Sequence, residues 1–390
     1  MKGKRLLTLL LAVMAVTVLV IAGCAPEAAP PEEEEGNGEV PEEEEEEEDG
    51  EPAQPEEEPI RLRMQTPYPT GIVMYDVGQH FVDMLNDMSG GRFEASLNPG
   101  GAVVDALKEM RAAHEGVLDV ALTASHYHTS EVGLVGDLFN LYPAGTNPWE
   151  FVVWFYYGGG KDLHQEMYDR QDLNVKAGML YGMTSAESFG WVADPITSLS
   201  DFEGMKFRTA GIWGDMLTEI GASVVTMPGG EVYEAAQRGV IDAFEFSTPG
   251  VDYSFGFHEL GAYLHGPGIH APQSAMEILV NQDVWNSMSP ELQAIFQGAA
   301  QASLVDGWAM TNWRDVEGMR ELTDYGTEFV SLPESVQLEV TQIAHDMYQD
   351  IAADDEFFAT VYNDQVEFLR DFRDYKNFAQ PDPDLMLPEE

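Results

Sequence analysis

Two stretches of the sequence repeat one pattern: residues 111–121 read RAAHEGVLDVA, and residues 234–244 read EAAQRGVIDAF. In each stretch a helical pattern ends at a glycine, Gly116 or Gly239, and an apolar strand pattern follows at once. Glycine readily adopts the left-handed conformation that ends many helices. The repeat therefore predicts two equivalent helix-to-strand units and, with them, two similar lobes. The alternative is a common junction that occurs twice by chance.

Helical and strand patterns alternate on both sides of this repeat. About 330 residues follow from Ile60, which is enough for two lobes and additional helices. The alternation predicts an α/β fold with mostly parallel sheets. The expected helices span residues 75–88, 103–114, 213–220 and 231–238, with a further one from Asn147, and the expected strands span residues 93–97, 117–123, 173–180, 205–208, 223–225 and 240–246.

Polar and aromatic residues follow two of the expected strands. Ser125-His126-Tyr127 comes after the strand of the first lobe, and Glu245-Phe246-Ser247 after that of the second. Ligands of open parallel sheets bind outside the carboxyl ends of the strands. We therefore expect a binding cleft between the lobes, and the alternative is two sheet edges that are capped by ordinary loops.

Three long helices are expected after the second lobe. Ser289-Pro290-Glu291 opens a helical pattern that runs to about residue 325, residues 331–334 open another, and residues 356–375 form a third. Their aromatic residues are expected to pack across the backs of both lobes. A role in partner binding or dimerisation is the alternative.

The amino terminus has the order of an export signal. Three basic residues precede an apolar run that ends at Ile21-Ala22-Gly23-Cys24, and Cys24 is the only cysteine. This order resembles a bacterial lipobox. We expect residues 1–23 to be a lipoprotein signal peptide and Cys24 to hold the mature protein at the outer face of a membrane through lipid. An uncleaved transmembrane anchor or a structural thiol is the alternative.

Residues 24–59 are expected to form an extended, disordered, lipid-anchored tether, because they contain 18 acidic residues and almost nothing to bury. The domain at residues 60–390 keeps 51 acidic against 16 basic residues. So negative a domain argues against nucleic acid or anionic lipid as a partner. With one cysteine in the chain, no disulfide is expected within it.

The sequence contains none of the common catalytic motifs. It has no nucleophile elbow, no His-Glu-x-x-His helix, no phosphate-binding loop and no dinucleotide motif, so we expect no enzyme activity. The histidines His126 and His128, together with His265 and His270, could bind a transition metal. We interpret them as ordinary polar loop histidines, because no dense cluster of histidine and carboxylate accompanies them.

Arg208 stands out because basic residues are scarce. It ends an expected strand directly before a turn and a helix. A guanidinium at such a position can bind a carboxylate through two parallel hydrogen bonds. A surface ion pair with an acidic neighbour is the alternative.

Residues 199–208, LSDFEGMKFR, and residues 233–249, YEAAQRGVIDAFEFSTP, resemble the extracytoplasmic solute receptors of TRAP transporters, the DctP family. The likeness extends from about residue 61 to residue 370. It implies a two-lobed fold of the periplasmic-binding-protein type, hinge strands about which the lobes close, and delivery of a small organic acid to TRAP membrane subunits. Competing functions are a receptor for an ABC importer or a sensor, and an extracellular hydrolase.

The sequence is most similar to the branch of this family that binds 2-oxo or 2-hydroxy monocarboxylates. The resemblance implies that Arg208 holds the carboxylate, and that Ca²⁺ or Na⁺ bridges to the ligand from Glu245, Glu187 and the carbonyl of Phe246. The ligand would be lined by Tyr127, Glu187, Phe246, His270 and Gln273.

The chain departs from that branch at three positions. Phe246 stands where tryptophan is common, Glu187 stands near a usual amide, and Ala271 replaces a usual acid. Either Glu187 compensates for Ala271, or the cation is absent and the ligand differs.

Overall fold

A computed structural model describes residues 58–209, 211–227, 229–260 and 263–381. The expected signal peptide, Cys24 and nearly all of the expected tether lie outside these residues. Within them, no helix is both long and apolar enough to cross a membrane.

Both copies of the repeat end their helices in the same way. Gly116 and Gly239 have φ angles of 74° and 69°. In each copy the residue after the glycine, Val117 or Val240, donates its backbone N–H to the carbonyl five residues earlier, at 2.8 and 2.9 Å. Two equivalent helix ends with left-handed glycines are thus confirmed.

The equivalence extends to two whole units of strands and helices. The first contains β1 (Ile60–Gln65), α2 (Val73–Ser89), β2 (Phe93–Asn98), α3 (Glu109–His114) and β3 (Val120–Thr123); the second contains β7 (Lys206–Arg208), α8 (Gly211–Ile220), β8 (Ser223–Val225), α9 (Gly229–Gln237) and β9 (Ala243–Phe244). Strand β1 pairs in parallel with β2 and β3, and β7 pairs in parallel with β8 and β9.

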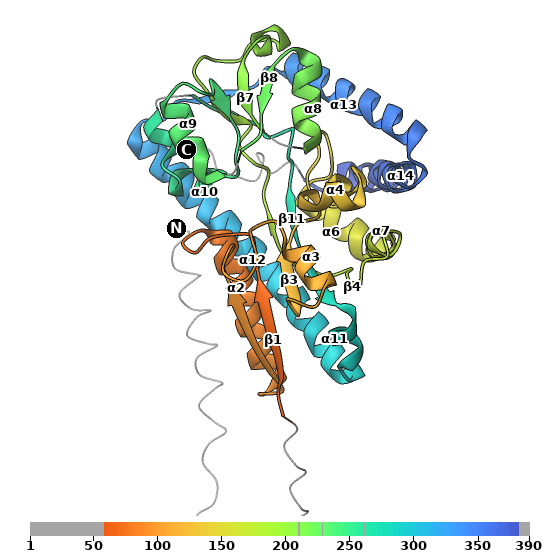
Figure 1. Cartoon of the computed structure of the whole chain (residues 1–390). Coiled ribbons are helices and arrows are strands. Elements are labelled where there is room, and N and C mark those ends of the chain that lie inside the picture. Colours follow the sequence, from red (N-terminus) through yellow and green to blue (C-terminus); the bar gives the residue numbers. More distant parts are fainter. Residues whose placement is uncertain (1–57, 210, 228, 261–262, 382–390) are drawn as a thin grey trace, which may run out of the picture. The chain divides into compact units, whose positions relative to one another are not determined.

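In each copy of the repeat, an aspartate links the end of the repeat to the first strand of its unit. Asp119 accepts a hydrogen bond from the N–H of Arg63 on β1 at 2.7 Å, and Asp242 accepts one from the N–H of Lys206 on β7 at 3.0 Å. The two lobes predicted from the repeat are therefore built in the same way, around two separate sheets (Figure 1).

Each sheet is completed by strands from outside its repeat unit. The first sheet has the order β2-β1-β3-β11-β4, with β5 also paired to β11, and the second has the order β12-β10-β6-β9-β7-β8. The added strands are β4 (Val175–Lys176), β5 (Leu180–Thr184), β6 (Gly190–Val192), β10 (Tyr263–Gly266), β11 (Ser274–Asn281) and β12 (Phe329–Ser331).

The expectation of mostly parallel sheets is wrong. Among the described residues, five strand pairings are parallel and five are antiparallel. The antiparallel pairings all involve β6 or β11, which enter their sheets from segments that cross between the lobes. The sheets are mixed, while the two-lobed α/β class holds.

Several expected elements are shorter than the sequence pattern indicated, and the strands expected at residues 117–123 and 240–246 are reduced to β3 and β9. Residues 103–108 do not continue α3, because Leu107 has a φ of 70° and the side-chain oxygen of Gln65 accepts the N–H groups of Val103 and Val104. The expected strand at residues 173–180 is divided into β4 and β5 around Gly178, whose φ is 79°.

Apart from helix α12 (Pro290–Tyr325), which leads from β11 to β12, two chain segments cross between the sheets, residues 185–189 from β5 to β6 and residues 267–273 from β10 to β11. They are bonded to each other, since the N–H of Glu187 donates to the carbonyl of Ala271 at 3.0 Å. Their contact is so close that a Cβ on Gly268 would lie 1.9 Å from the carbonyl oxygen of Glu187. These two crossing segments stand where the family resemblance implies the hinge strands.

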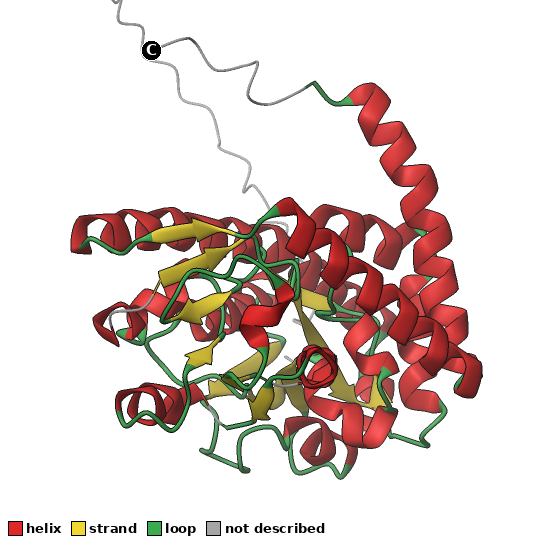
Figure 2. Cartoon of the chain, turned by 90° about the horizontal axis from the view of Figure 1, so that it is seen from above, coloured by secondary structure: helices red, strands yellow, loops and turns green. Residues whose placement is uncertain are grey.

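Helices enclose the strands of both sheets (Figure 2). The 36-residue α12 (Pro290–Tyr325) packs on α2 and β5 at the first lobe and on α10 (Pro249–Ser254) at the second. Two glycines permit these approaches: a Cβ on Gly307 would lie 2.6 Å from Val77, and one on Gly318 would lie 2.5 Å from Gly250. Helices α13 (Glu334–Asp354) and α14 (Glu356–Ala379) pack on each other, as expected for helices that cover both lobes. Helix α13 also packs on α8, and α14 packs on α5 (Val135–Leu138) and α6 (Pro148–Tyr157).

The remaining helices connect these parts. They are η1 (Ser125–His128), α4 (Thr129–Val132), α5 (Val135–Leu138), α6 (Pro148–Tyr157), α7 (Gly160–Asp169), η2 (Leu199–Phe202), α10 (Pro249–Ser254), η3 (Phe257–Leu260), α11 (Gln282–Ser287), α12 (Pro290–Tyr325), α13 (Glu334–Asp354) and α14 (Glu356–Ala379). Helix α6 begins at Asn147 as predicted, with a reciprocal cap between Asn147 and Glu150.

Candidate functional site

Arg208 lies at the end of β7 with its guanidinium buried and fixed in orientation. Nε and Nη2 donate to the carbonyl of Met227 at 3.2 and 3.1 Å, and Nη1 donates to the carbonyl of Glu245 at 2.7 Å. The parallel register of β7 and β9 pairs Arg208 with Phe244, which brings Glu245 to this position. The alternative of an exposed ion pair is therefore wrong, because only 10% of the side chain is exposed.

Two carboxylates and an imidazole lie together beside Arg208. Oε1 of Glu245 is 3.3 Å from Nη1 of Arg208, while Nε2 of His270 is 3.6 Å from Oε2 of Glu187 and 4.0 Å from Oε2 of Glu245. Glu187 and His270 come from the two crossing segments, and Glu245 directly follows β9. In the described part of the chain, these three residues are the one group whose ligand atoms lie close enough to hold a metal ion.

The buried side chains of this cluster have shifted pKa values. Burial and the carboxylate of Glu245 raise the pKa of Glu187 well above its usual range. Burial lowers the pKa of His270 to about 4, so its imidazole is neutral at pH 7. A further negative group could enter only with protons or a cation to offset the charge.

The first lobe contributes tyrosines to the same place. Burial raises the pKa of Tyr127 in η1 to about 12, and its hydroxyl is close enough to Glu187 and Arg208 to interact with both charges. Tyr68, which the sequence reasoning missed, lies beside Tyr127, and burial raises its pKa well above its usual range. Tyr68 follows the carboxyl end of β1 as Tyr127 follows that of β3, and this position was the signal that could have revealed it.

Aromatic rings surround the polar cluster. The imidazole of His270 lies 5.6 Å, between ring centroids, from both Phe189 and Trp213. Phe246 packs against Phe255 with centroids 4.7 Å apart, and its ring lies 5.6 Å from the guanidinium carbon of Arg208. Trp213 was not among the predicted site residues, and its indole N–H is buried with no hydrogen-bond partner in the described chain.

Gln273 is the predicted site residue that the described contacts place elsewhere. Its side-chain amide donates to the carbonyl of Asn140, so it fastens a crossing segment to the first lobe. The side-chain oxygen of Gln273 is buried and has no hydrogen-bond partner among the described residues. No contact joins it to Arg208 or to the carboxylates in this structure, and its role in the site stays a prediction.

The other candidate histidines have structural roles. His128 lies 3.2 Å from the hydroxyl of Thr123, and Nε2 of His265 accepts the N–H of Ile196 at 3.1 Å. His126 is packed on Tyr127, with ring centroids 3.8 Å apart. These three are not the polar loop histidines that the sequence indicated, because His126 and His128 lie in η1, His265 lies on β10, and both His128 and His265 are buried. They stand outside the cluster beside Arg208, whereas His270 faces two carboxylates.

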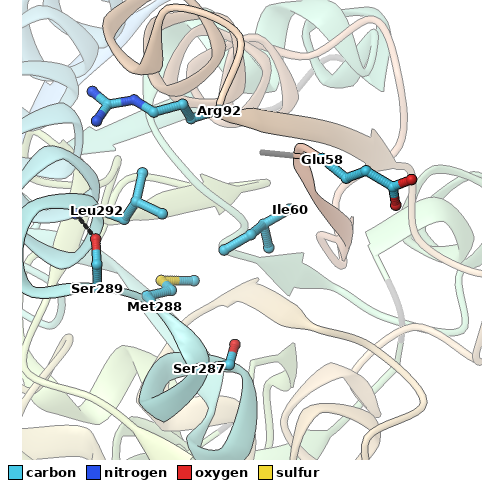
Figure 3. Close-up of a pocket in the computed structure, with 7 residues that line it drawn as sticks. All are labelled: Glu58, Ile60, Arg92, Ser287, Met288, Ser289 and Leu292. Atoms are coloured by element: carbon cyan, nitrogen blue, oxygen red, sulfur yellow. Dashed lines mark hydrogen bonds between the residues drawn. The ribbon is translucent and has the colours of Figure 1, made fainter. Parts of the chain in front are cut away.

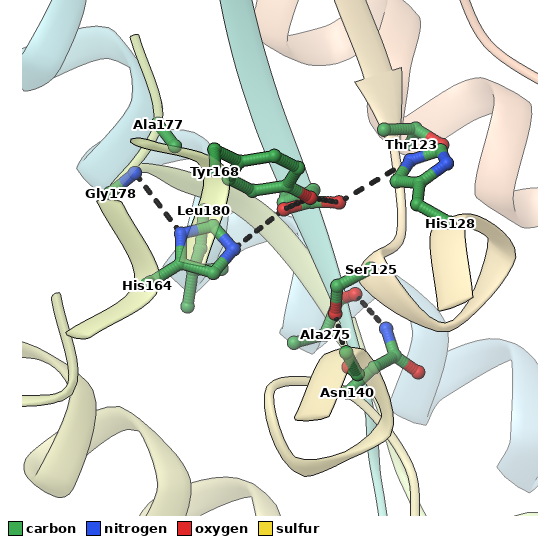
Figure 4. A network of polar contacts seen from close by, with 12 residues as sticks. Thr123, Ser125, His128, Asn140, His164, Tyr168, Ala177, Gly178, Leu180 and Ala275 are labelled. Atoms are coloured by element: carbon green, nitrogen blue, oxygen red, sulfur yellow. Dashed lines mark hydrogen bonds and ion pairs between the residues drawn. The ribbon is translucent and has the colours of Figure 1, made fainter. Parts of the chain in front are cut away.

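A buried carboxylate network supports η1, and with it Tyr127 (Figure 4). On β11, Oε2 of Glu277 accepts a hydrogen bond from Nε2 of His164 at 2.6 Å, and Oε1 accepts one from the hydroxyl of Tyr168 at 2.8 Å and lies 3.7 Å from Nε2 of His128. Nδ1 of His164 accepts the N–H of Gly178 at 3.1 Å, which leaves Nε2 to carry the proton. Burial raises the pKa of Glu277, but the hydrogen bond from His164, the electrostatic effect of His164 and His128, and the hydrogen bond from Tyr168 together lower it to below its usual range.

A hollow lies at the start of β1, away from this cluster (Figure 3). It is lined by Glu58, Ile60, Arg92, Ser287, Met288, Ser289 and Leu292. The guanidinium of Arg92 already pairs with Glu291 at 2.8 Å and with the carbonyl of Ser89 at 2.9 Å. The hollow therefore lacks the convergent polar groups of the cluster at the hinge.

Two α/β lobes joined by crossing segments, with buried charges where the lobes meet, define a two-lobed solute-binding protein. The chain belongs to the DctP family, described as bacterial extracellular solute-binding proteins of family 7, whose profile matches residues 68–355. The resemblance and the fold class inferred from the sequence are thereby confirmed. The matched proteins are described as solute-binding proteins and not as enzymes, which agrees with the expectation from the sequence.

Individual relatives cover most of the chain. A monocarboxylate 2-oxoacid-binding periplasmic protein of Nostoc sp. is 28% identical over 333 residues, which are 82% of this chain and 89% of that protein. A TRAP periplasmic solute-binding protein of Colwellia psychrerythraea, solved with bound calcium and pyruvate, is 27% identical with a TM-score of 0.78 and covers 82% of this chain and 97% of its own. A counterpart of Pseudoalteromonas atlantica, solved with sodium and pyruvate, is 25% identical with a TM-score of 0.77 and the same coverage of both chains.

Proposed function

We propose that this protein is the receptor of a TRAP transporter, that it captures a small 2-oxo or 2-hydroxy monocarboxylate, and that it delivers this acid to the membrane subunits. The observation that carries the proposal is the buried, oriented guanidinium of Arg208, which lies in the second lobe beside Tyr127 of the first. The names of the relatives, one a 2-oxoacid-binding protein and two solved with pyruvate, support the same class of ligand.

Arg208 suits the ligand carboxylate because backbone carbonyls already fix its plane. Nη1 also donates to Oε1 of Glu245 at 3.3 Å, so a single N–H on Nη2 is left by the described contacts, and a bidentate carboxylate would take the place of Oε1. Tyr127 keeps its proton at pH 7 and can donate to the same anion from the opposite lobe. Binding would therefore engage both lobes and favour the closed form.

The carboxylates of Glu245 and Glu187 would repel the ligand unless a cation lay between them and it. The relatives with bound calcium or sodium support such a cation, and Glu245, Glu187 and the carbonyl of Phe246 are the proposed oxygen ligands. A bound cation would supply positive charge to the carboxylate and the 2-oxo or 2-hydroxy oxygen. Phe246, His270 and Gln273 complete the proposed lining.

The placement of the protein in the cell follows from residues outside the described part. We propose residues 1–23 as a signal peptide, Cys24 as the lipidated residue, residues 24–59 as the acidic tether and residues 60–390 as the binding domain. The order of basic, apolar and small residues before the single cysteine supports this division. The receptor would thus act outside the cytoplasmic membrane.

Substitution of Arg208 tests the proposed function. Arg208→Ala should lower the affinity for pyruvate or lactate by about 2 to 5 kcal/mol, because the buried ligand charge loses its partner. Isothermal titration and thermal shift measure this, and Arg238→Ala, at an exposed arginine paired with Glu234, is the matched control with unchanged affinity. A folded Arg208→Ala protein that binds these acids as the wild type does would overturn the proposal.

A further inference from the structure

His270 is a buried imidazole with unused coordinating capacity. Only 1% of the residue is exposed, and neither ring nitrogen has a hydrogen-bond partner among the described residues. Buried polar atoms almost always have hydrogen-bond partners. Two buried ring nitrogens without a partner therefore require an explanation, such as a bound ion or water. The neutral ring presents a lone pair, and Phe189 and Trp213 pack around it on neighbouring sides.

The distances around His270 fit ligands of one metal ion better than hydrogen bonds. Nε2 lies 3.6 Å from Oε2 of Glu187 and 4.0 Å from Oε2 of Glu245, which is beyond hydrogen-bond length. Ligand atoms at about 2.1 Å from a tetrahedral zinc ion lie about 3.4 Å apart. A small movement of the imidazole toward the two carboxylates would therefore bring Nε2 to this spacing from both.

The chemistry of the donors selects among cations. Calcium and sodium prefer sites made of oxygen atoms, whereas imidazole favours zinc and its neighbours in the transition series. Ala271, next to His270, offers no side-chain donor. We propose that Glu187, Glu245 and His270 bind a divalent transition metal of the zinc type, and that this ion, rather than calcium or sodium, accompanies the organic acid.

This inference deepens the proposed function and rests on it for the identity of the acid. A 2-oxo or 2-hydroxy acid can bind such an ion through one carboxylate oxygen and the neighbouring oxygen. Three protein ligands leave positions free for both atoms. Because Glu187 and His270 belong to the two crossing segments, the ion would also join these segments where the lobes hinge.

The test uses the binding domain without a histidine tag, stripped of metal by a chelator. Equilibrium dialysis against zinc alone and calcium alone should give one zinc per chain, bound at least about tenfold more tightly than calcium. X-ray absorption at the zinc edge of the wild-type protein should show one imidazole ligand. This spectrum does not depend on whether a variant folds.

Two variants sharpen the result. His270→Gln should weaken zinc binding by about tenfold or more and change calcium binding by less than about threefold. The control is His265→Gln, at an equally buried histidine that faces no carboxylate pair, and it should bind zinc as the wild type does. Zinc that binds no more tightly than calcium, a spectrum without imidazole, or a folded His270→Gln protein with wild-type zinc affinity would each overturn the inference.

Titration with pyruvate separates this inference from the proposed function. Pyruvate binding that needs only calcium or sodium would overturn the metal assignment and leave the receptor function standing. Zinc coordinated by imidazole, with no binding of pyruvate or any other small organic acid, would overturn the function and leave the metal assignment standing.

Discussion

Arg208 and Gln65 occupy equivalent positions in the two halves of one repeat, yet they do different things. Gln65 ends β1 and bonds to Glu109 at 2.8 Å, so it serves the packing of the first lobe. Arg208 ends β7 and faces two carboxylates where the lobes meet. One guanidinium cannot offset two carboxylates and an anionic ligand in a buried site, so a proton or a cation belongs to the binding reaction.

Glu277 shows how a buried charge can serve the site without contacting the ligand. Glu277→Gln should lower the free energy of unfolding by about 1 to 3 kcal/mol, because His164 and Tyr168 both donate to this side chain and an amide group cannot accept from both in the same way. Urea denaturation measures the change. Glu166→Gln, at an exposed partner of Arg170, is the control, with an expected change below about 0.5 kcal/mol.

The same residue predicts a dependence on pH. The pKa of Glu277 is below its usual range in the folded protein, so the unfolded chain takes up the proton first and the contribution is lost as the pH falls through the folded pKa. Wild-type stability should therefore fall more steeply than that of Glu277→Gln below about pH 4.5. Parallel slopes for the two proteins would show that this carboxylate is not ionised in the fold.

At the scale of elements, the two crossing segments link the site to the hinge. The N–H of Ser188 donates to the carbonyl of Ser247 at 2.9 Å, and the N–H of Glu187 donates to that of Ala271 at 3.0 Å. One segment is thereby bonded both to the other and to the residues after β9. A shift in either segment displaces a carboxylate or the imidazole of the cluster.

Gly268→Ala should disturb this arrangement. Its Cβ would lie 1.9 Å from the carbonyl oxygen of Glu187, so the two segments must separate. We expect a lower melting temperature and a loss of about tenfold or more in affinity for the organic acid, since misplacement of about 1 Å can be costly in a preorganised site. Gly230→Ala is the control, because no atom lies within 4 Å of its added Cβ. Equal affinity of both variants would contradict the role given to the hinge contact.

Sequence patterns predicted the helices well where residues close in sequence provide the hydrogen bonds that the helix ends need. The caps at Asn147 and Ser289 marked the starts of α6 and α12, and α12 ends at Tyr325 as expected. The sequence pattern gave a wrong prediction at residues 103–108. There the side-chain oxygen of Gln65, which is distant in sequence, accepts the backbone N–H groups of Val103 and Val104. Periodicity carries no information about such a partner.

Part of the candidate site could likewise be predicted from the sequence. Strand ends revealed Arg208, Glu245 and Tyr127, because position at a sheet edge follows from the order of elements. The pairing of His270 with two carboxylates was not foreseen, since it depends on how two crossing segments meet. The mixed sheets were missed for the same reason. The direction of β6 and β11 depends on how the chain crosses between the lobes, and the hydrophobic pattern of the sequence does not show this.

At the scale of the whole molecule, charge argues against direct attachment of the domain surface to a membrane, so the predicted lipid is the attachment we expect. The domain from Ile60 has 51 acidic against 16 basic residues, and the preceding segment adds 18 more acids. Anionic lipid headgroups would repel such a surface. Acyl chains contribute about 0.8 kcal/mol for each buried CH₂ group, which is enough to hold the protein when more than one chain is attached.

Cys24→Ser should therefore release the protein or leave it as an unprocessed precursor, while the wild type sediments with membranes. Fractionation of cells followed by immunoblotting measures both outcomes. Because the substitution lies outside the binding domain, the Cys24→Ser domain should bind organic acids as tightly as the wild type, which serves as the internal control for folding. Equal membrane association of the two proteins, without accumulation of precursor, would show that residues other than Cys24 attach the chain and would overturn the lipoprotein assignment.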